Sequence, residues 1–197
     1  MVIAVGRFMG LAVAAMIVAT ISTIFWPVDS PEQKLISKGA KLCYAPNETL
    51  LVGAKLEGDD FGDDEVIIAA SIPSMQRLSL AGSSVTARGI RALQSLSKLS
   101  SLDLSETNCA DDVISELCAL PCVRELEVNR CRWLKDADLS HLSKMKSLEF
   151  LSLNETTISA VGIAQLEQIP ALRLVRLERC PQIDDSAIDA LASLCGK

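Results

Sequence analysis

Hydrophobic positions recur along the chain with a period of 24 or 25 residues from residue 51 onward. Each period contains an apolar anchor: Leu56, Leu80, Leu104, Val128, Leu153 and Leu177. A second apolar residue stands two positions before each anchor, which is the alternation of a short strand with one buried face. Ten or eleven residues later a further pair follows at the i, i+3 spacing of one helix face, as in Ile90 and Leu93. The pattern predicts six strand–helix units over residues 51–197.

A single strand–helix unit cannot bury its own apolar side and must stack on its neighbours. The expected fold is therefore an α/β solenoid with a concave parallel sheet on one side and helices on the convex side. Pro73, Pro121 and Pro170 occupy the same slot after three of the predicted helices, where a residue without an N–H group ends a helix at little cost.

Two segments show the repeat most clearly: "LSSLDLSETNCADDVISELCALP" and "LEFLSLNETTISAVGIAQLEQIP". They resemble the leucine-rich-repeat family, and the resemblance implies a leucine-rich-repeat solenoid over residues 51–197. Two units carry Cys131 or Cys180 three positions past the anchor and resemble the cysteine-containing subtype of F-box leucine-rich-repeat proteins. This second resemblance implies a substrate-recognition adaptor as the alternative function, although no F-box-like helical segment precedes the repeats.

The N-terminal segment is strongly apolar. Residues 8–26 contain no charged side chain, and 19 helical residues would measure about 28 Å, enough to cross the hydrocarbon core of a bilayer. The sequence therefore predicts a single-pass anchor at residues 1–26, a polar linker at 27–50 and the solenoid at 51–197. A cleavable signal peptide is the rival interpretation, but the run is long for one and no clear cleavage site ends it. The flanking charges leave the side of the membrane open, leaning towards the exported side.

Composition and charge narrow the function classes. The net charge of −6 and the pI near 4.9 argue against nucleic-acid binding, which needs clustered Lys and Arg. The seven cysteines form no CxxC pair, and His141 is the one histidine of the chain, so we expect no metal and no cofactor. Most of the cysteines are expected to be small buried hydrophobic residues.

Acidic residues suggest two other sites, a calcium-binding loop and a catalytic triad, and both have simpler explanations. The acidic stretch at residues 57–65 lacks the alternating oxygen ligands of a calcium loop. Asp63, Asp111, Asp136 and Asp185 stand in register at predicted helix starts, where a carboxylate can cap free N–H groups. A Ser–His–Asp catalytic triad would have to use His141, but His141 precedes the predicted core residue Leu142 on a convex helix, and no glycine-rich nucleophile turn lies nearby. We therefore predict that the protein is not an enzyme.

The candidate binding residues are the strand side chains that the core does not need. They are predicted to point outward from the concave sheet: Arg77, Asp103, Glu125, Glu127, Phe150, Leu174 and Arg176. Asp103, Glu125 and Glu127 are expected to form an acidic centre beside an apolar pair, Phe150 and Leu174. Arg173, Arg176 and Arg179 are expected to add a basic end.

The predicted function is membrane-anchored protein binding or scaffolding by this concave face, with a partner of unknown identity. A further expectation concerns the last unit, which ends at "LASLCGK" without a polar capping segment. Terminal repeats normally need a cap. We therefore expect self-association, or completion by a partner, through this end.

Overall fold

The computed structural model describes residues 30–46, 50–109, 112–184 and 187. In these ranges seven strands form one sheet in chain order: β1 (Lys41–Tyr44), β2 (Leu51–Lys55), β3 (Arg77–Ser79), β4 (Ser101–Asp103), β5 (Glu125–Glu127), β6 (Phe150–Ser152) and β7 (Leu174–Arg176). β1 is antiparallel to β2, and every later pair is parallel. The parallel strands pair in the predicted register, so equivalent residues of successive units form straight columns across the sheet.

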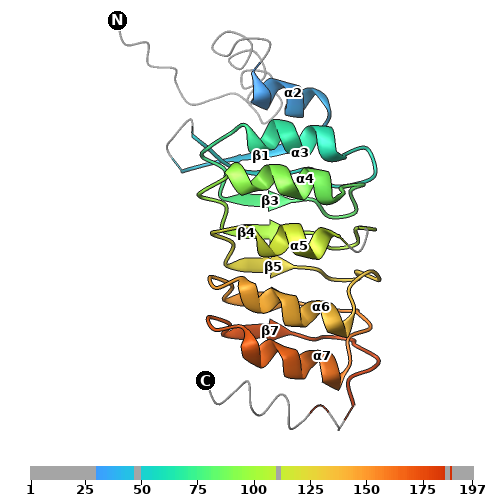
Figure 1. Cartoon of the computed structure of the whole chain (residues 1–197). Coiled ribbons are helices and arrows are strands. Elements are labelled where there is room, and N and C mark those ends of the chain that lie inside the picture. Colours follow the sequence, from blue (N-terminus) through green and yellow to red (C-terminus); the bar gives the residue numbers. More distant parts are fainter. Residues whose placement is uncertain (1–29, 47–49, 110–111, 185–186, 188–197) are drawn as a thin grey trace, which may run out of the picture.

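Helices stack along one side of the sheet (Figure 1). The α-helices are α2 (Pro31–Ser37), α3 (Asp63–Ala70), α4 (Ala87–Ala92), α5 (Val113–Cys118), α6 (Asp136–His141) and α7 (Ala160–Gln165). Three of them continue into a 3-10 turn: η1 (Leu93–Ser95), η2 (Leu142–Lys144) and η3 (Leu166–Gln168). The strand–helix alternation predicted from the sequence is confirmed over the described residues.

The core lies between the sheet and the helices. The middle residue of each inner strand and the anchor two positions later are fully or almost fully buried, as in Leu102, Leu104 and Leu126. The apolar helix residues meet them from the other side, among them Ile90, Leu93 and Leu117. Each unit thus contributes one layer to a single continuous core.

The sequence predicts a linker over residues 27–50, but the described part of this range contains α2 and β1. Ser30 accepts a hydrogen bond from the Gln33 N–H group, and Pro31 occupies the first turn of α2. Leu35 is fully buried, and Lys38 makes an ion pair with Glu65 of α3 at 3.0 Å. The helix and strand therefore cover the first repeat and end the sheet with an antiparallel strand.

Two of the predicted capping aspartates cap a different helix from the one expected. Asp63 lies inside the first turn of its own helix α3, and its carboxylate accepts hydrogen bonds from the Thr86 and Gly89 N–H groups at the start of α4. Asp136 likewise accepts hydrogen bonds from Ser159 at the start of α7. Each carboxylate joins two neighbouring units at a helix N-terminus. Asp111 and Asp185 lie outside the described residues.

The fold class and location predicted from the sequence need one correction. They include a single-pass membrane helix, but no helix in the described ranges is long and apolar enough to cross a bilayer. The longest of these helices, α3, has eight residues, whereas a membrane span needs about 20. The segment concerned, residues 8–26, lies outside the described residues. The fold class is therefore corrected to an α/β solenoid with a seven-stranded sheet, and the described residues do not support the predicted membrane anchor and membrane location.

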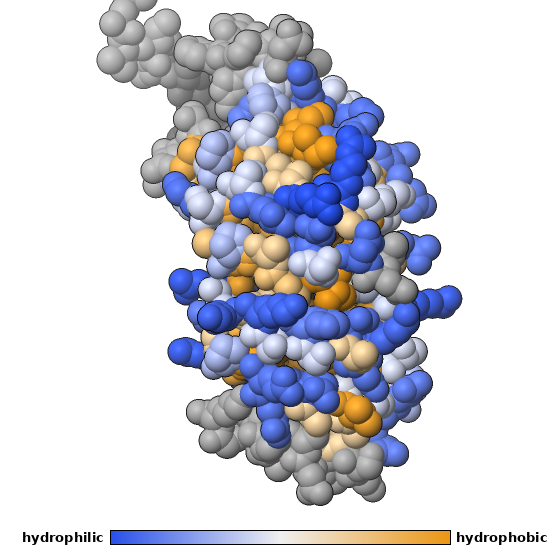
Figure 2. All heavy atoms as spheres, viewed as in Figure 1, coloured by the Kyte–Doolittle hydropathy of each residue, from blue (hydrophilic) through white to orange (hydrophobic). Residues whose placement is uncertain are grey.

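The end of the sixth unit, where self-association is expected, also falls outside the described ranges. Figure 2 shows the side of the molecule formed by the helices, where polar side chains predominate. The large exposed apolar residues of the helices are scattered: Ile36 lies on α2, Ile67 on α3 and Val161 on α7. The helical side therefore offers no single broad apolar surface among the described residues.

Candidate protein-binding surface

The side chains that point away from the helices form the open sheet face, which we define as the outward residues of β2 to β7. In each of β3 to β6 the middle residue points into the core, and its two neighbours point outward. The seven candidate residues Arg77, Asp103, Glu125, Glu127, Phe150, Leu174 and Arg176 all lie at outward positions. No element in the described ranges covers this face, so these side chains are available to a partner.

The predicted acidic centre is present. Asp103 and Glu127 are direct neighbours in the register of β4 and β5, and Glu125 lies on the same strand as Glu127. Among the described residues no Lys or Arg lies within ion-pair distance of these three carboxylates. Asp103 instead accepts hydrogen bonds from the Ser79 hydroxyl at 3.1 Å and the Ser105 N–H at 2.9 Å. No cation therefore contacts the centre directly, although Arg176 acts on Glu127 and Lys55 on Asp103 from beyond ion-pair distance.

The arrangement changes the ionisation of Glu127. Partial burial of its carboxyl, and then the charge of Asp103, raise the pKa of Glu127 above its ordinary value. The Asn129 side-chain amide donates a hydrogen bond to Glu127 at 3.2 Å and offsets part of this effect. Both carboxylates line a hollow of about 340 Å³ over β2 to β5. Gly53, Ser79 and Ser101 leave it open because their side chains are small.

The expected apolar pair is altered by Arg176. Its guanidinium carbon lies 5.2 Å from the centre of the Phe150 ring, which is a cation–π contact. Leu174 is 53% exposed beside them. Phe150, Leu174 and Arg176 therefore form a mixed apolar and basic patch next to the acidic centre.

The predicted basic end is divided. Arg179 is expected to lie with Arg173 and Arg176, but it stands two positions beyond the anchor Leu177 and points to a rim of the sheet. There it makes an ion pair with Glu155 at 3.6 Å. Arg176 remains on the open sheet face, so the two arginines belong to different surfaces.

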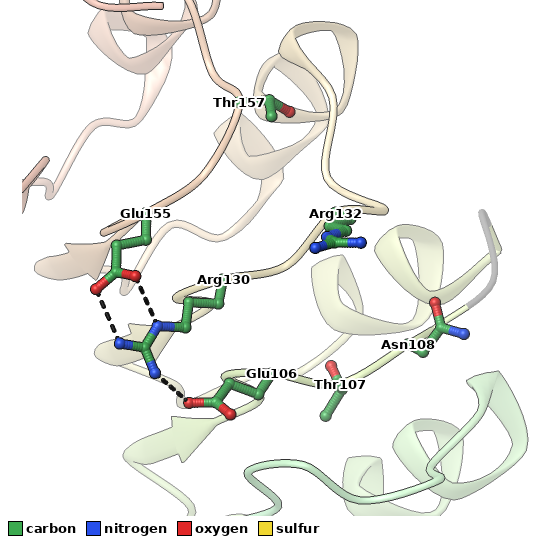
Figure 3. A pocket seen from close by; sticks show the side chains of 7 residues that line it. All are labelled: Glu106, Thr107, Asn108, Arg130, Arg132, Glu155 and Thr157. Atoms are coloured by element: carbon green, nitrogen blue, oxygen red, sulfur yellow. Dashed lines mark hydrogen bonds and ion pairs between the residues drawn. The ribbon is translucent and has the colours of Figure 1, made fainter. Parts of the chain in front are cut away.

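An ion-pair ladder that was not predicted from the sequence runs along this rim. The residue two positions after each anchor has a positive φ angle in every unit: Gly58, Gly82, Glu106, Arg130, Glu155 and Arg179. The last four alternate in charge. Arg130 pairs with Glu106 at 2.8 Å and with both oxygens of Glu155 at 2.8 and 2.9 Å (Figure 3). The alternating column in the sequence could have revealed the ladder.

A second missed network runs just inside this rim. Asn129 donates a hydrogen bond to the Ser105 hydroxyl, and its side-chain oxygen accepts from the Ser152 hydroxyl and the Asn154 N–H. Asn154 in turn accepts from the Glu178 N–H at 2.7 Å. These amides lock the ends of β4 to β7 together and give the candidate residues a rigid support.

The described cysteines of the repeat differ in burial: Cys109, Cys131 and Cys180 are buried, whereas Cys118 and Cys122 are partly exposed. Cys131 and Cys180 are buried, and each donates its thiol to the carbonyl of an anchor in the preceding unit, Leu104 or Leu153. Burial raises the pKa of the Cys131 thiol to about 11. No group of His, Cys, Asp or Glu that could hold a metal ion occurs within the described ranges.

Comparison with known proteins gives matches to solved structures alone. No known family model and no curated protein matches the sequence. Internalin C2 of Listeria monocytogenes aligns with 28% identity and a TM-score of 0.50, over 66% of this chain and 52% of its own. A second Listeria internalin, inlF, aligns with 23% identity and a TM-score of 0.49, over 65% of this chain and 35% of its own.

Internalins are leucine-rich-repeat proteins. The chain has a leucine-rich-repeat-like fold. This supports the coarser of the two resemblances, whereas the F-box subtype is not shown. The chain spans about half of internalin C2 and about a third of inlF.

Proposed function

We propose that this leucine-rich-repeat module binds another protein through its open sheet face. The partner presents a basic side chain to Asp103, Glu125 and Glu127 and an apolar group to Phe150 and Leu174. The interaction is one of recognition and not of catalysis. The likeness to internalin C2 supports a protein-binding role of this general kind.

The acidic centre, which makes no direct ion pair, is the observation that carries the proposal. Like charges directly opposite each other in a sheet are destabilising, and after partial burial the charge of Asp103 is the next cause of the raised pKa of Glu127. Neutral residues at these positions would satisfy the fold equally well, because the side chains lie outside the core. A Lys or Arg from a partner would neutralise the centre and form charge-assisted hydrogen bonds with it.

The mixed patch supplies the second half of the surface. Leu174 is one of the large hydrophobic residues that are more than half exposed, and it stands beside the Phe150 ring. Aromatic and arginine side chains are common anchors at protein interfaces. An apolar group of the partner can therefore pack on Leu174 and Phe150 while Arg176 stays over the ring.

The alternative function is a substrate-recognition adaptor similar to F-box leucine-rich-repeat proteins. It rests on the two cysteine-containing units alone. Cys131 and Cys180 are buried within the repeat and touch no exposed surface, so they support the packing of the units and not one particular partner.

A site-specific crosslinking experiment tests the proposal. A photoreactive residue at Ser101, on the open sheet face, should crosslink one partner protein, whereas the same residue at Ser115 on α5 should not. The identified partner is then titrated against Glu127→Gln and Asp103→Asn, and each should weaken binding about tenfold or more, in the range of a lost interfacial charge pair. His141→Ala, on the helical side, is the control and should bind as the unmodified chain does. Loss of binding in the His141 variant alone would show that the wrong surface has been chosen.

A further inference from the structure

A hollow of about 570 Å³ lies at the rim beside the ion-pair ladder, and neither Asp103 nor Glu127 lines it. Its lining comes from the segments that follow β4, β5 and β6. Glu106, Arg130 and Glu155 form the wall nearest the sheet, and Thr107 lies at the buried base (Figure 3). The remaining lining residues are Asn108, Arg132 and Thr157.

Asn108, Arg132 and Thr157 occupy the same slot, four positions after the anchor, in three successive units. All three are exposed. Because the strands of neighbouring units lie about 4.8 Å apart, this slot forms a column parallel to the ladder. The Asn108 amide therefore lies on one side of the Arg132 guanidinium, and the Thr157 hydroxyl lies on the other.

The two arginines of the hollow differ in what they contact. Arg130 directs three of its nitrogens to the carboxylates of Glu106 and Glu155. Arg132 has no ion pair or hydrogen bond among the described residues, and Figure 3 shows it apart from the paired group. Five other arginines of the described chain are ion-paired with a carboxylate: Arg88, Arg91, Arg124, Arg130 and Arg179. Arg132 is thus the cation of the hollow that is free to bind a ligand.

We propose that the rim hollow binds a carboxylate group, held by Arg132 and flanked by Asn108 and Thr157. A guanidinium binds a carboxylate through two parallel N–H donors, and the Asn108 amide on one side and the Thr157 hydroxyl on the other are donors for the oxygen nearer to each. In a protein partner the group is an Asp or Glu side chain or a chain terminus.

The charges of the lining favour a carboxylate over a phosphate. Arg130 and Arg132 contribute two positive charges, and Glu106 and Glu155 contribute two negative charges, so the lining is neutral as a whole. One unpaired guanidinium matches one negative charge. A phosphate dianion would bring a second charge close to Glu106 and Glu155, with no further free cation in the hollow to neutralise it.

The test is an NMR titration of the isotopically labelled full chain with sodium acetate, at constant ionic strength set with sodium chloride. The backbone amides of Asn108, Arg132 and Thr157 should shift saturably, and the Arg132 Nε–H signal should shift with them. Arg132→Gln should abolish the saturable response. Arg124→Gln is the matched control, because Arg124 is an exposed arginine that pairs with Glu149, and it should leave the response unchanged.

A parallel titration with inorganic phosphate distinguishes the two anions. Tighter binding of phosphate than of acetate would overturn the assignment to a carboxylate. A response that persists in Arg132→Gln, or that spreads evenly over all exposed arginines, would overturn the site itself. Because neither Asp103 nor Glu127 lines this hollow, the outcome does not depend on whether the open sheet face binds a partner.

Discussion

Replacing Gly89 with alanine tests whether aspartate caps hold neighbouring repeats together. Gly89 lies in the first turn of α4, and its N–H donates to the Asp63 carboxylate at 3.1 Å. A Cβ atom at this position would lie 2.5 Å from an oxygen of Asp63 and 2.7 Å from a methyl carbon of Val85. Both distances are too short, so the Asp63 carboxylate would have to withdraw.

The magnitude follows from what that withdrawal breaks. Asp63 accepts from the Thr86 N–H at 2.8 Å, the Thr86 hydroxyl at 2.6 Å and the Gly89 N–H. Loss of a side-chain cap costs about 0.5–2 kcal/mol, and loss of a negative charge at a helix N-terminus about 0.3–1 kcal/mol more. Alanine regains about 1 kcal/mol over glycine through helix propensity. Together with the crowding at Val85, we expect a net loss of about 1–2 kcal/mol.

A double-mutant cycle isolates this mechanism. Urea unfolding followed by circular dichroism would compare Gly89→Ala, Asp63→Ala and the double variant. Once Asp63 is absent, the cap is already lost, so Gly89→Ala should be neutral or stabilise the protein by up to about 1 kcal/mol. Asp136 and Gly162 repeat the same geometry between α6 and α7 and should show the same reversal. Additive effects, or a Gly89→Ala variant that is more stable than the unmodified chain, would refute the reasoning.

Two further predictions concern the core and the acidic centre. Leu126→Ala should lower the free energy of unfolding by about 2–5 kcal/mol, because Leu126 is 1% exposed in the middle of β5 and the shorter side chain leaves a cavity. Urea unfolding measures this change. A loss below about 1 kcal/mol would contradict the assignment of Leu126 to the core. Glu127 has a folded pKa above its unfolded value, so its protonated form stabilises the fold below the unfolded pKa and this contribution is lost as the pH rises through the folded pKa. Glu127→Gln should therefore be at least as stable as the unmodified chain at about pH 7, and its stability should fall less between about pH 4 and pH 7. Urea unfolding across that pH range measures both effects. A variant that loses stability at neutral pH would show that the Glu127 charge supports the fold.

The repeating fold is predictable because the alternation of buried and outward strand residues is a local pattern that recurs in all six units. A strand residue such as Leu102 must be buried, and its neighbours must then point outward. The parallel register follows from the equal spacing of the units, which by itself places Asp103 beside Glu127. The open sheet face can therefore be predicted residue by residue, although its role in binding stays a prediction.

The features that the sequence analysis missed depend on contacts between units or on weak local signals. The cap on α4 is a case of the first kind, because Asp63 lies at the start of its own helix in the sequence, whereas its hydrogen-bond partner 23 residues later is set by the stacking of the units. The helix α2 is a case of the second kind. Ser30 followed by Pro31 is a helix start signal, but the surrounding prolines and polar residues favour a linker. Arg179 is assigned to the sheet face by its sequence neighbours, because its left-handed backbone conformation cannot be inferred from them alone.

The rim ladder shows how charge can occupy a position that the backbone reserves for glycine. Gly58 and Gly82 adopt the positive φ angle without a steric penalty, whereas Glu106, Arg130, Glu155 and Arg179 adopt it at a cost of about 1 kcal/mol each. An exposed ion pair contributes about 0–1 kcal/mol, so the ladder does no more than offset that cost. Its value to the protein therefore does not lie in stability. The ladder neutralises the charge of Arg130. Arg132, two residues later in the chain and further from the sheet, keeps its positive charge free. The rim hollow therefore has a single positive site, between the acidic centre and the helices.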